Sequence, residues 1–306
     1  FRSDDGTDGD LADLRVDGAG AGQDLGRLLQ QVHQRARVPL RPGADDQRQR
    51  AEGVQPVADV EGEDADKNIT IGAFNGWDES FATAGIMKNV LEKDGYKVTI
   101  KGFDAGPGYA GLVAGDIDLI TDGWLPLTHA DYVKRYGDKM ENLGCWYDNA
   151  KLTIAVNKDS KAKTIGDLKS MGDDYGNTLY GIEAGAGLTK VTQQSAIPKY
   201  GLKNLNFKIS STPAMLSQLK KATAANRDIA VTLWRPHWAY GAFPVRDLED
   251  PKNAMGDAEV IYSFARPGFE KDFPKAAQLM RNMAFDDKTL SDLEDTMFSA
   301  DKYGGK

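Results

Sequence analysis

Apolar and polar residues follow two different rhythms from about residue 67 onward. Segments 69–74 and 96–103 combine short apolar runs with alternation, which is typical of β-strands. Between them, apolar residues recur at helical spacing and predict a helix over 80–94. A strand, a helix and a second strand at this spacing indicate a parallel sheet with a crossover helix.

The same pattern continues to the end of the chain. Thr164 is placed to cap a helix that begins near Ile165. Two similar α/β lobes joined by two strand-like crossings would enclose a ligand-binding cleft. We predict that residues 67–156 and 235–306 form lobe 1 and that residues 157–234 form lobe 2. Further strands are predicted at 117–120, 151–157, 178–182, 207–211 and 228–233, and further helices at 108–114, 129–136, 187–200, 213–224, 274–282 and 288–297.

Residues 1–66 differ in composition from the rest of the chain. They contain no Lys, Trp or Tyr and a single Phe, whereas the remainder holds all five Trp and all eleven Tyr. Such a segment has too few apolar residues to offset the entropy of ordering. We predict a disordered, low-complexity extension, with an isolated amphipathic helix over 24–37. The change from Arg-only to Lys-rich composition also suggests that the domain proper begins near Lys67, and any export signal is expected to lie outside this sequence or to have been removed.

Charge and cysteine content exclude several classes of protein. The net charge is −8, but residues 67–306 are nearly balanced, with 30 Lys and Arg against 31 Asp and Glu. Nucleic acid and anionic membrane surfaces are therefore not expected partners. Cys145 is the only cysteine, which excludes an intrachain disulfide and CxxC redox or zinc chemistry. No cofactor or metal ion is predicted.

Three tryptophans stand in separate turn-like contexts. Trp77, Trp124 and Trp234 are each followed within two residues by a proline or an acidic side chain, which is typical of strand ends and loops. A trimethylammonium group donates no hydrogen bond, so proteins hold it between aromatic faces that present negative charge. These three residues therefore predict a cage for an organic cation, while Trp146 and Trp238 are interpreted as packing residues.

Eight segments resemble, in chain order, the substrate-binding proteins of glycine betaine/proline betaine ABC importers. The resemblance covers residues 68–297 and implies a two-lobed α/β fold of the periplasmic-binding-protein type II ("Venus flytrap") class, with two crossings between the lobes. The segments are IGAFNGWDES, DAGPGYAGLVAGDIDLITDGWLPLTHADY, WYDNAKLTIAV, YGIEAGAGLTK, SSTPAMLSQL, TLWRPHWAY, LEDPKNAMGDAE and ARPGFEKDFPKAA.

The resemblance also implies the roles of individual residues. The onium cage falls on Trp77, Trp124 and Trp234. The carboxylate anchor falls on the side chain of His129 and on the backbone N–H groups of Gly187 and Leu188. The glycine turn stands where a helix is predicted to start, so unpaired N–H groups and the positive end of the helix dipole can face an anion.

The sequence departs from the family pattern at three places. Arg235 follows the third cage tryptophan, where a small hydroxyl residue is usual, and we expect its cation to point to solvent. Ala184 replaces a proline of the glycine turn without removing an N–H donor. The C-terminal helices usual in the family are largely absent after Met297. His237 is expected to brace the loop of Trp234 and is only a secondary site candidate.

Other functions fit the sequence less well. For a hydrolase, only His129 and His237 could act as general bases, and neither neighbours Cys145 or a G-x-S-x-G elbow. The run GIEAGAGLTK lacks the Gly-Lys-Ser/Thr order of a phosphate loop.

Within the binding class, choline and carnitine are the alternatives. Choline would need an acidic partner, for which Asp78 is available, but choline-binding relatives carry a Tyr where this chain has Leu152.

The combined hypothesis is a non-enzymatic solute receptor. It would capture glycine betaine or a related betaine, such as proline betaine, carnitine or dimethylsulfoniopropionate, for import by an ABC transporter permease. We expect a monomer that is periplasmic or otherwise extracytoplasmic and associated with the cell envelope.

Overall fold

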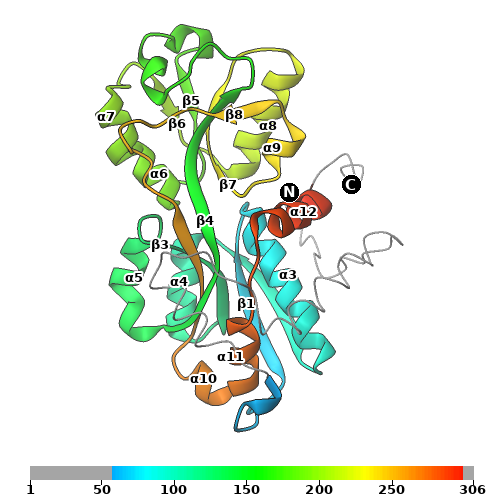
Figure 1. The fold of residues 1–306 in the computed structure, drawn as a ribbon. Coiled ribbons are helices and arrows are strands. Elements are labelled where there is room, and N and C mark those ends of the chain that lie inside the picture. Colours follow the sequence, from blue (N-terminus) through cyan, green and yellow to red (C-terminus); the bar gives the residue numbers. More distant parts are fainter. Residues whose placement is uncertain (1–56, 299–306) are drawn as a thin grey trace, which may run out of the picture.

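The structure is a computed structural model and describes residues 57–298 (Figure 1). The helix predicted over 24–37 and most of the predicted disordered extension lie outside the described residues. Two lobes stand one above the other and are joined by the long strand β4 (Glu141–Asn157) and by a second crossing near the end of lobe 2. Lobe 1 contains β1 (Asn68–Phe74), α3 (Asp78–Lys93), β2 (Lys97–Phe103), α4 (Ala105–Ala114), β3 (Leu119–Leu125), α5 (Ala130–Tyr136), β9 (Glu259–Ala265), α10 (Phe269–Asp272), α11 (Pro274–Arg281) and α12 (Asp287–Phe298).

Lobe 2 is a smaller α/β unit above lobe 1. The helix predicted over 187–200 is present, but it is interrupted by one π-helical turn at Thr192–Ala196. The predicted cap at Thr164 is also present: the Thr164 side chain accepts the Asp167 N–H of a 3₁₀ helix, and the Asp167 carboxylate accepts the Thr164 N–H at 2.8 Å. The elements of lobe 2 are two short 3₁₀ helices (Ile165–Lys169 and Gly172–Tyr175), β5 (Thr178–Tyr180), α6 (Gly187–Val191), α7 (Ile197–Tyr200), β6 (Asn206–Lys208), α8 (Thr212–Ala224), β7 (Ala230–Arg235), α9 (Ala239–Ala242) and β8 (Val245–Asp247).

The strands form one mixed sheet in the order β2-β1-β3-β9-β4-β7-β5-β6, with β8 beside β4. The strands at the centre of each lobe are parallel, as predicted: β1 pairs with β2 and β3, and β5 pairs with β6 and β7. The expectation of purely parallel sheets is wrong at the crossings, where β4 runs antiparallel to β9 in lobe 1 and to β7 in lobe 2. β4 is thus one continuous strand shared by both lobes.

The second crossing comes later in the chain than predicted. Strand β8 pairs with Ala155–Asn157 of β4, and the Leu248 N–H still donates to the Ile154 carbonyl at 2.8 Å. The chain returns to lobe 1 only at Glu259, where β9 begins. The boundary predicted at residue 235 therefore falls inside lobe 2, and the chain crosses back in the segment between β8 and β9.

Residues 57–66, predicted to be disordered, pack on lobe 1. The Ala65 N–H donates to the Asp272 carbonyl at 2.6 Å, and the Asp64 carboxylate accepts the Lys275 N–H at 2.9 Å and the Tyr96 hydroxyl. These hydrogen bonds hold the segment on lobe 1 through backbone and carboxylate groups. The segment therefore needs few apolar residues to pack there. The prediction of disorder is therefore wrong for residues 57–66.

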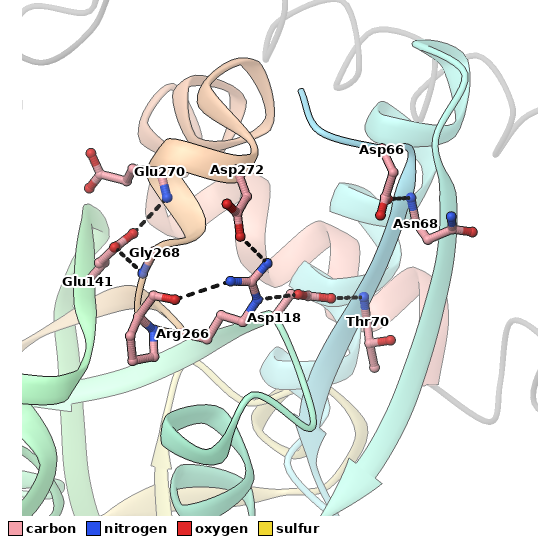
Figure 2. Close-up of polar contacts among 10 residues, drawn as sticks. Asp66, Asn68, Thr70, Asp118, Glu141, Arg266, Gly268, Glu270 and Asp272 are labelled. Carbon is pink, nitrogen blue, oxygen red and sulfur yellow. Dashed lines mark hydrogen bonds and ion pairs between the residues drawn. The ribbon is translucent and has the colours of Figure 1, made fainter. Parts of the chain in front are cut away.

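A network of ion pairs and hydrogen bonds connects the end of β9 to the start of β1 (Figure 2). The Arg266 guanidinium donates to Asp118 at 2.7 Å and pairs with Asp272 at 2.9 Å. Asp118 in turn accepts the Thr70 N–H at 2.7 Å, while Glu141 accepts the Gly268 N–H at 2.6 Å. Charge-assisted bonds of this kind hold together segments that are almost 200 residues apart in the chain.

Across residues 57–298, no helix has the length and hydrophobicity needed to cross a bilayer.

Candidate functional site

A cavity lies between the lobes and is walled by residues from both. The space between its lining side chains amounts to about 270 Å³, which includes space open to solvent. Lobe 1 contributes the end of β3, the turn after it and the start of α3, and lobe 2 contributes β4, β7 and the start of α6. The lining residues are Trp77, Glu79, Trp124, Thr128, His129, Leu152, Ile182, Leu188 and Trp234. Five of the six residues proposed from the sequence are in this set, and Gly187 adjoins it.

The three predicted cage tryptophans all line the cavity and are almost fully buried. Trp77 contacts Phe74 edge-on with the ring centroids 5.1 Å apart. The Trp124 indole N–H donates to Asp122 Oδ1 at 2.6 Å, which fixes the orientation of its ring. Trp234 stands at the end of β7 and contacts His237 edge-on, with centroids 4.5 Å apart. Two rings therefore come from lobe 1 and one from lobe 2.

His129 presents a hydrogen-bond donor to the cavity. Its Nδ1 accepts the backbone N–H of Trp124 at 2.9 Å, so the proton of the neutral ring resides on Nε2. Burial lowers the His129 pKa to about 3, and the ring is therefore neutral at physiological pH. It stacks on Trp77 with centroids 5.4 Å apart. The buried Nε2 has no hydrogen-bond partner among the described residues.

The glycine turn of lobe 2 meets the His129 turn of lobe 1. Helix α6 begins at Gly187, and within residues 57–298 no acceptor is found for the N–H groups of Gly187 and Leu188. A Cβ on Gly187 would lie 2.0 Å from the Thr128 carbonyl oxygen, so only glycine allows the two backbones this close. The unpaired donors of both lobes therefore converge on the same region.

Glu79 is a cavity residue that the sequence reasoning missed. It is only 2% exposed, and its Oε2 atom has no partner among the described residues. Burial raises the Glu79 pKa well above its usual value, and the negative charges of Asp122 and Glu294 raise it further. The only signal in the sequence is the pattern Trp-Asp-Glu at the predicted helix start, which does not distinguish Glu79 from Asp78.

Asp78 and Trp238 instead form a contact between the lobes. The Trp238 indole N–H of lobe 2 donates to the Asp78 carboxylate of lobe 1. Burial raises the Asp78 pKa to about 6, although this hydrogen bond opposes the increase. Asp78 does not line the cavity. Trp146 is a packing residue, as predicted, and its ring lies edge-on to Phe285.

His237 and Arg235 support the Trp234 loop from outside the cavity. His237 Nδ1 accepts the Ala239 N–H at 3.0 Å, and burial lowers the His237 pKa to about 3. The Arg235 guanidinium lies 3.6 Å from the centre of the Tyr240 ring and pairs with Asp247 at 2.7 Å. The expectation that this cation points to solvent is therefore wrong, because Asp247 and the Tyr240 ring hold it, but Arg235 does not line the cavity.

Residues 67–302 match the family described as the substrate-binding domain of the ABC-type glycine betaine transport system. The chain belongs to this family. A glycine betaine/carnitine transport binding protein, GbuC of Listeria monocytogenes, is 40% identical over 127 residues, which are 41% of this chain. The aligned segment spans 42% of the listerial protein, less than half of its length.

Solved structures confirm the two-lobed fold implied by the resemblance. The glycine betaine/L-proline-binding protein ProX from Borrelia burgdorferi superimposes with a TM-score of 0.70 and 30% identity, over 78% of this chain and 91% of that one. Lactococcal OpuAC, in a closed conformation complexed with glycine betaine, gives a TM-score of 0.71 and 28% identity over 79% and 91% of the two chains. The family of substrate-binding proteins expected from the sequence motifs is likewise confirmed.

Proposed function

We propose that this protein captures glycine betaine or a closely related betaine in the cavity between its lobes and delivers it to an ABC transporter permease. The observation that carries the proposal is the combination of groups around the cavity. Three indoles line it, and N–H donors of His129, Gly187 and Leu188, for which no acceptor is found among residues 57–298, lie in or beside the same lining. A betaine has the matching pair of groups, an onium head and a carboxylate.

The onium head would lie among Trp77, Trp124 and Trp234. Each aromatic face contributes about 0.5 to 2 kcal/mol to cation binding, more when water is excluded. All three rings are less than 8% exposed, so the larger values apply. The methyl groups also gain apolar contact with Leu152 and Ile182, which carry no polar side-chain atom.

The carboxylate would accept hydrogen bonds from His129, Gly187 and Leu188. The neutral ring of His129 can donate through Nε2, because Nδ1 is already occupied by the Trp124 N–H. Gly187 and Leu188 add two backbone donors at the positive end of a helix dipole. The dipole favours a carboxylate here without a full positive charge that would repel the onium head.

Ligand binding would couple to closure of the lobes. The proposed contacts come from both lobes, so a bound betaine favours the form in which they meet. Direct contacts add to this preference: the Tyr132 hydroxyl donates to the Gly185 carbonyl at 3.0 Å, and Lys190 pairs with Asp131. The permease would then recognise the closed form. We propose a monomer that acts outside the cytoplasmic membrane.

Choline and carnitine are the alternatives in the same class. Carnitine also pairs an onium head with a carboxylate and fits the same donors. Choline has no carboxylate and would leave the His129, Gly187 and Leu188 donors unpaired, which costs affinity. A hydrolase gains no support, because the low pKa of His129 and the occupied Nδ1 leave no basic nitrogen at neutral pH.

Isothermal titration of the full chain with glycine betaine, proline betaine, carnitine and choline tests the proposal. Tighter binding of a betaine than of choline is expected. Tight choline with weak betaine would assign the protein to choline capture. Absence of binding to all four would overturn the proposed function.

A further inference from the structure

Four carboxyl groups lie together behind the tryptophan cage, and we call them the acid cluster: Asp78, Glu79, Asp122 and Glu294. They come from α3, β3 and α12, and Glu79, Asp122 and Glu294 are each at most 2% exposed. Among residues 57–298, no Lys or Arg forms an ion pair with any of them. A buried anion without a cation nearby is costly, so this cluster retains protons or requires a cation from outside.

Glu79 is the member of the acid cluster that lines the ligand cavity. It shares the cavity wall with all three indoles, and its Oε2 atom is buried without a hydrogen-bond partner in the described part of the chain. No residue that lines the cavity is a Lys or Arg. An onium head held by the indoles would therefore be the cation beside this carboxyl group.

The surroundings of Glu79 favour its protonated form while the cavity holds no cation. Ionisation of Asp122 from β3 or Glu294 from α12 would add negative charge beside it, and ionisation of Asp78 would add negative charge near Glu294. A backbone hydrogen bond at Glu79 and the Trp234 indole from β7 favour the carboxylate, but desolvation outweighs them, and His129 is neutral. Tyr109 from α4, which lies against Asp122, has a raised pKa and remains an uncharged phenol. Desolvation and like charge thus act in the same direction.

We propose that Glu79 is the charge partner of the bound onium group and that ligand binding releases its proton. The inference rests on the proposed function, because it requires a quaternary ammonium in the cage. The step is a simple ionisation: the Glu79 O–H bond breaks, its electron pair stays on the carboxylate and the proton passes to solvent buffer. No covalent bond to the ligand forms.

Proton release makes betaine affinity depend on pH. An opposite charge within about 4 to 6 Å changes the proton affinity of a carboxyl group by about ten- to thousandfold. By linkage, the same factor separates the ligand affinities of the protonated and ionised protein. Betaine should therefore bind more tightly as pH rises through the range in which Glu79 ionises, by up to this factor. The carboxylate of glycine betaine stays ionised across this range and does not contribute.

The test is calorimetric titration of the full chain with glycine betaine at pH 7 in two buffers of different ionisation enthalpy. The difference in apparent binding enthalpy counts the protons released. 3,3-Dimethylbutanoate is the matched neutral-head ligand, because it replaces only the onium nitrogen by carbon. Glu79→Gln keeps the shape of the side chain but cannot ionise. Glu92→Gln is the control on the same helix, where Glu92 pairs with Lys88 at the surface.

Proton release with glycine betaine, its absence with 3,3-dimethylbutanoate and its loss in Glu79→Gln but not in Glu92→Gln are the expected results. Release that persists in Glu79→Gln, or equal enthalpies of wild-type binding in both buffers, would overturn the proposal while leaving betaine binding intact. The wild-type measurement decides even if Glu79→Gln folds poorly. Failure of the wild type to bind any betaine would instead refute the proposed function, which separates the two conclusions.

Discussion

Replacing Trp234 with leucine should weaken glycine betaine binding by removing the only cage ring that lobe 2 supplies. The ring is 3% exposed and lines the cavity, so a cation against it is largely desolvated. A cation–π contact of about 0.5 to 2 kcal/mol corresponds to a loss of about two- to thirtyfold in affinity. Burial favours the upper half of this range, and we expect about tenfold.

Comparison with two other variants separates the aromatic effect from loss of packing. Trp234→Phe keeps a ring and should retain more affinity than Trp234→Leu, although phenylalanine is the weaker cation binder. Trp146→Phe alters a tryptophan that is equally buried but lies outside the cavity, and it should leave affinity within about twofold while lowering stability. Calorimetric titration gives the dissociation constants, and thermal melts confirm folding.

Two outcomes would refute the cage reasoning. Equal affinity of the folded Trp234→Leu and Trp234→Phe variants would mean that the ring face contributes nothing beyond apolar contact. Equal losses in the Trp146 and Trp234 variants would mean that the effect is general destabilisation. In either case Trp234 would have to be removed from the proposed cage.

His129→Ala should weaken betaine binding by about tenfold or more, because a hydrogen bond to a charged group contributes about 1.5 to 3 kcal/mol. Choline binding should weaken much less. Equal losses in titrations of both ligands would show that His129 does not bind the carboxylate. Gly187→Ala places a Cβ 2.0 Å from the Thr128 carbonyl oxygen and should hold the lobes apart. Small-angle scattering would detect this as loss of ligand-induced compaction. Gly185→Ala is the control and should behave as the wild type, because the atom nearest to its Cβ would be the Tyr132 hydroxyl oxygen at 4.0 Å. Burial raises the Asp122 pKa from 3.8 to about 7, so between these values the folded protein holds a proton that the unfolded chain has lost. The free energy of unfolding of the ligand-free protein should therefore fall as pH rises from about 4 to about 7, by at most about 4 kcal/mol from this group, and denaturant titrations of Asp122→Asn should show a shallower fall.

Local sequence patterns predicted the elements whose pairing is also local. The strands β1 and β2 and the helix α3 begin and end within about two residues of the predicted bounds, because each has its own apolar rhythm. The same reasoning missed β9 and the first half of β4. These strands are specified by antiparallel pairing with each other, across more than 100 residues of chain, and not by a pattern within either segment.

The candidate site shows the same difference between what local sequence patterns predict and what long-range contacts decide. The positions of the cage tryptophans, of His129 and of the glycine turn were predictable because each belongs to a short motif whose residue types suit the ligand. Glu79 was missed because the choice between it and Asp78 depends on the rotation of α3. Only the folded helix turns Glu79 into the cavity and leaves Asp78 to meet Trp238.

The sequence by itself therefore determined the family, the two-lobed fold and the chemical inventory of the site, since these depend on residue types within short segments. Only the tertiary structure decided which of these residues contact one another. Gly187 reaches Thr128 only because the lobes close, and Glu294 reaches Glu79 only because α12 packs against α3 over more than 200 residues of intervening chain. Contacts of this range depend on the packing of whole elements, which no local pattern encodes.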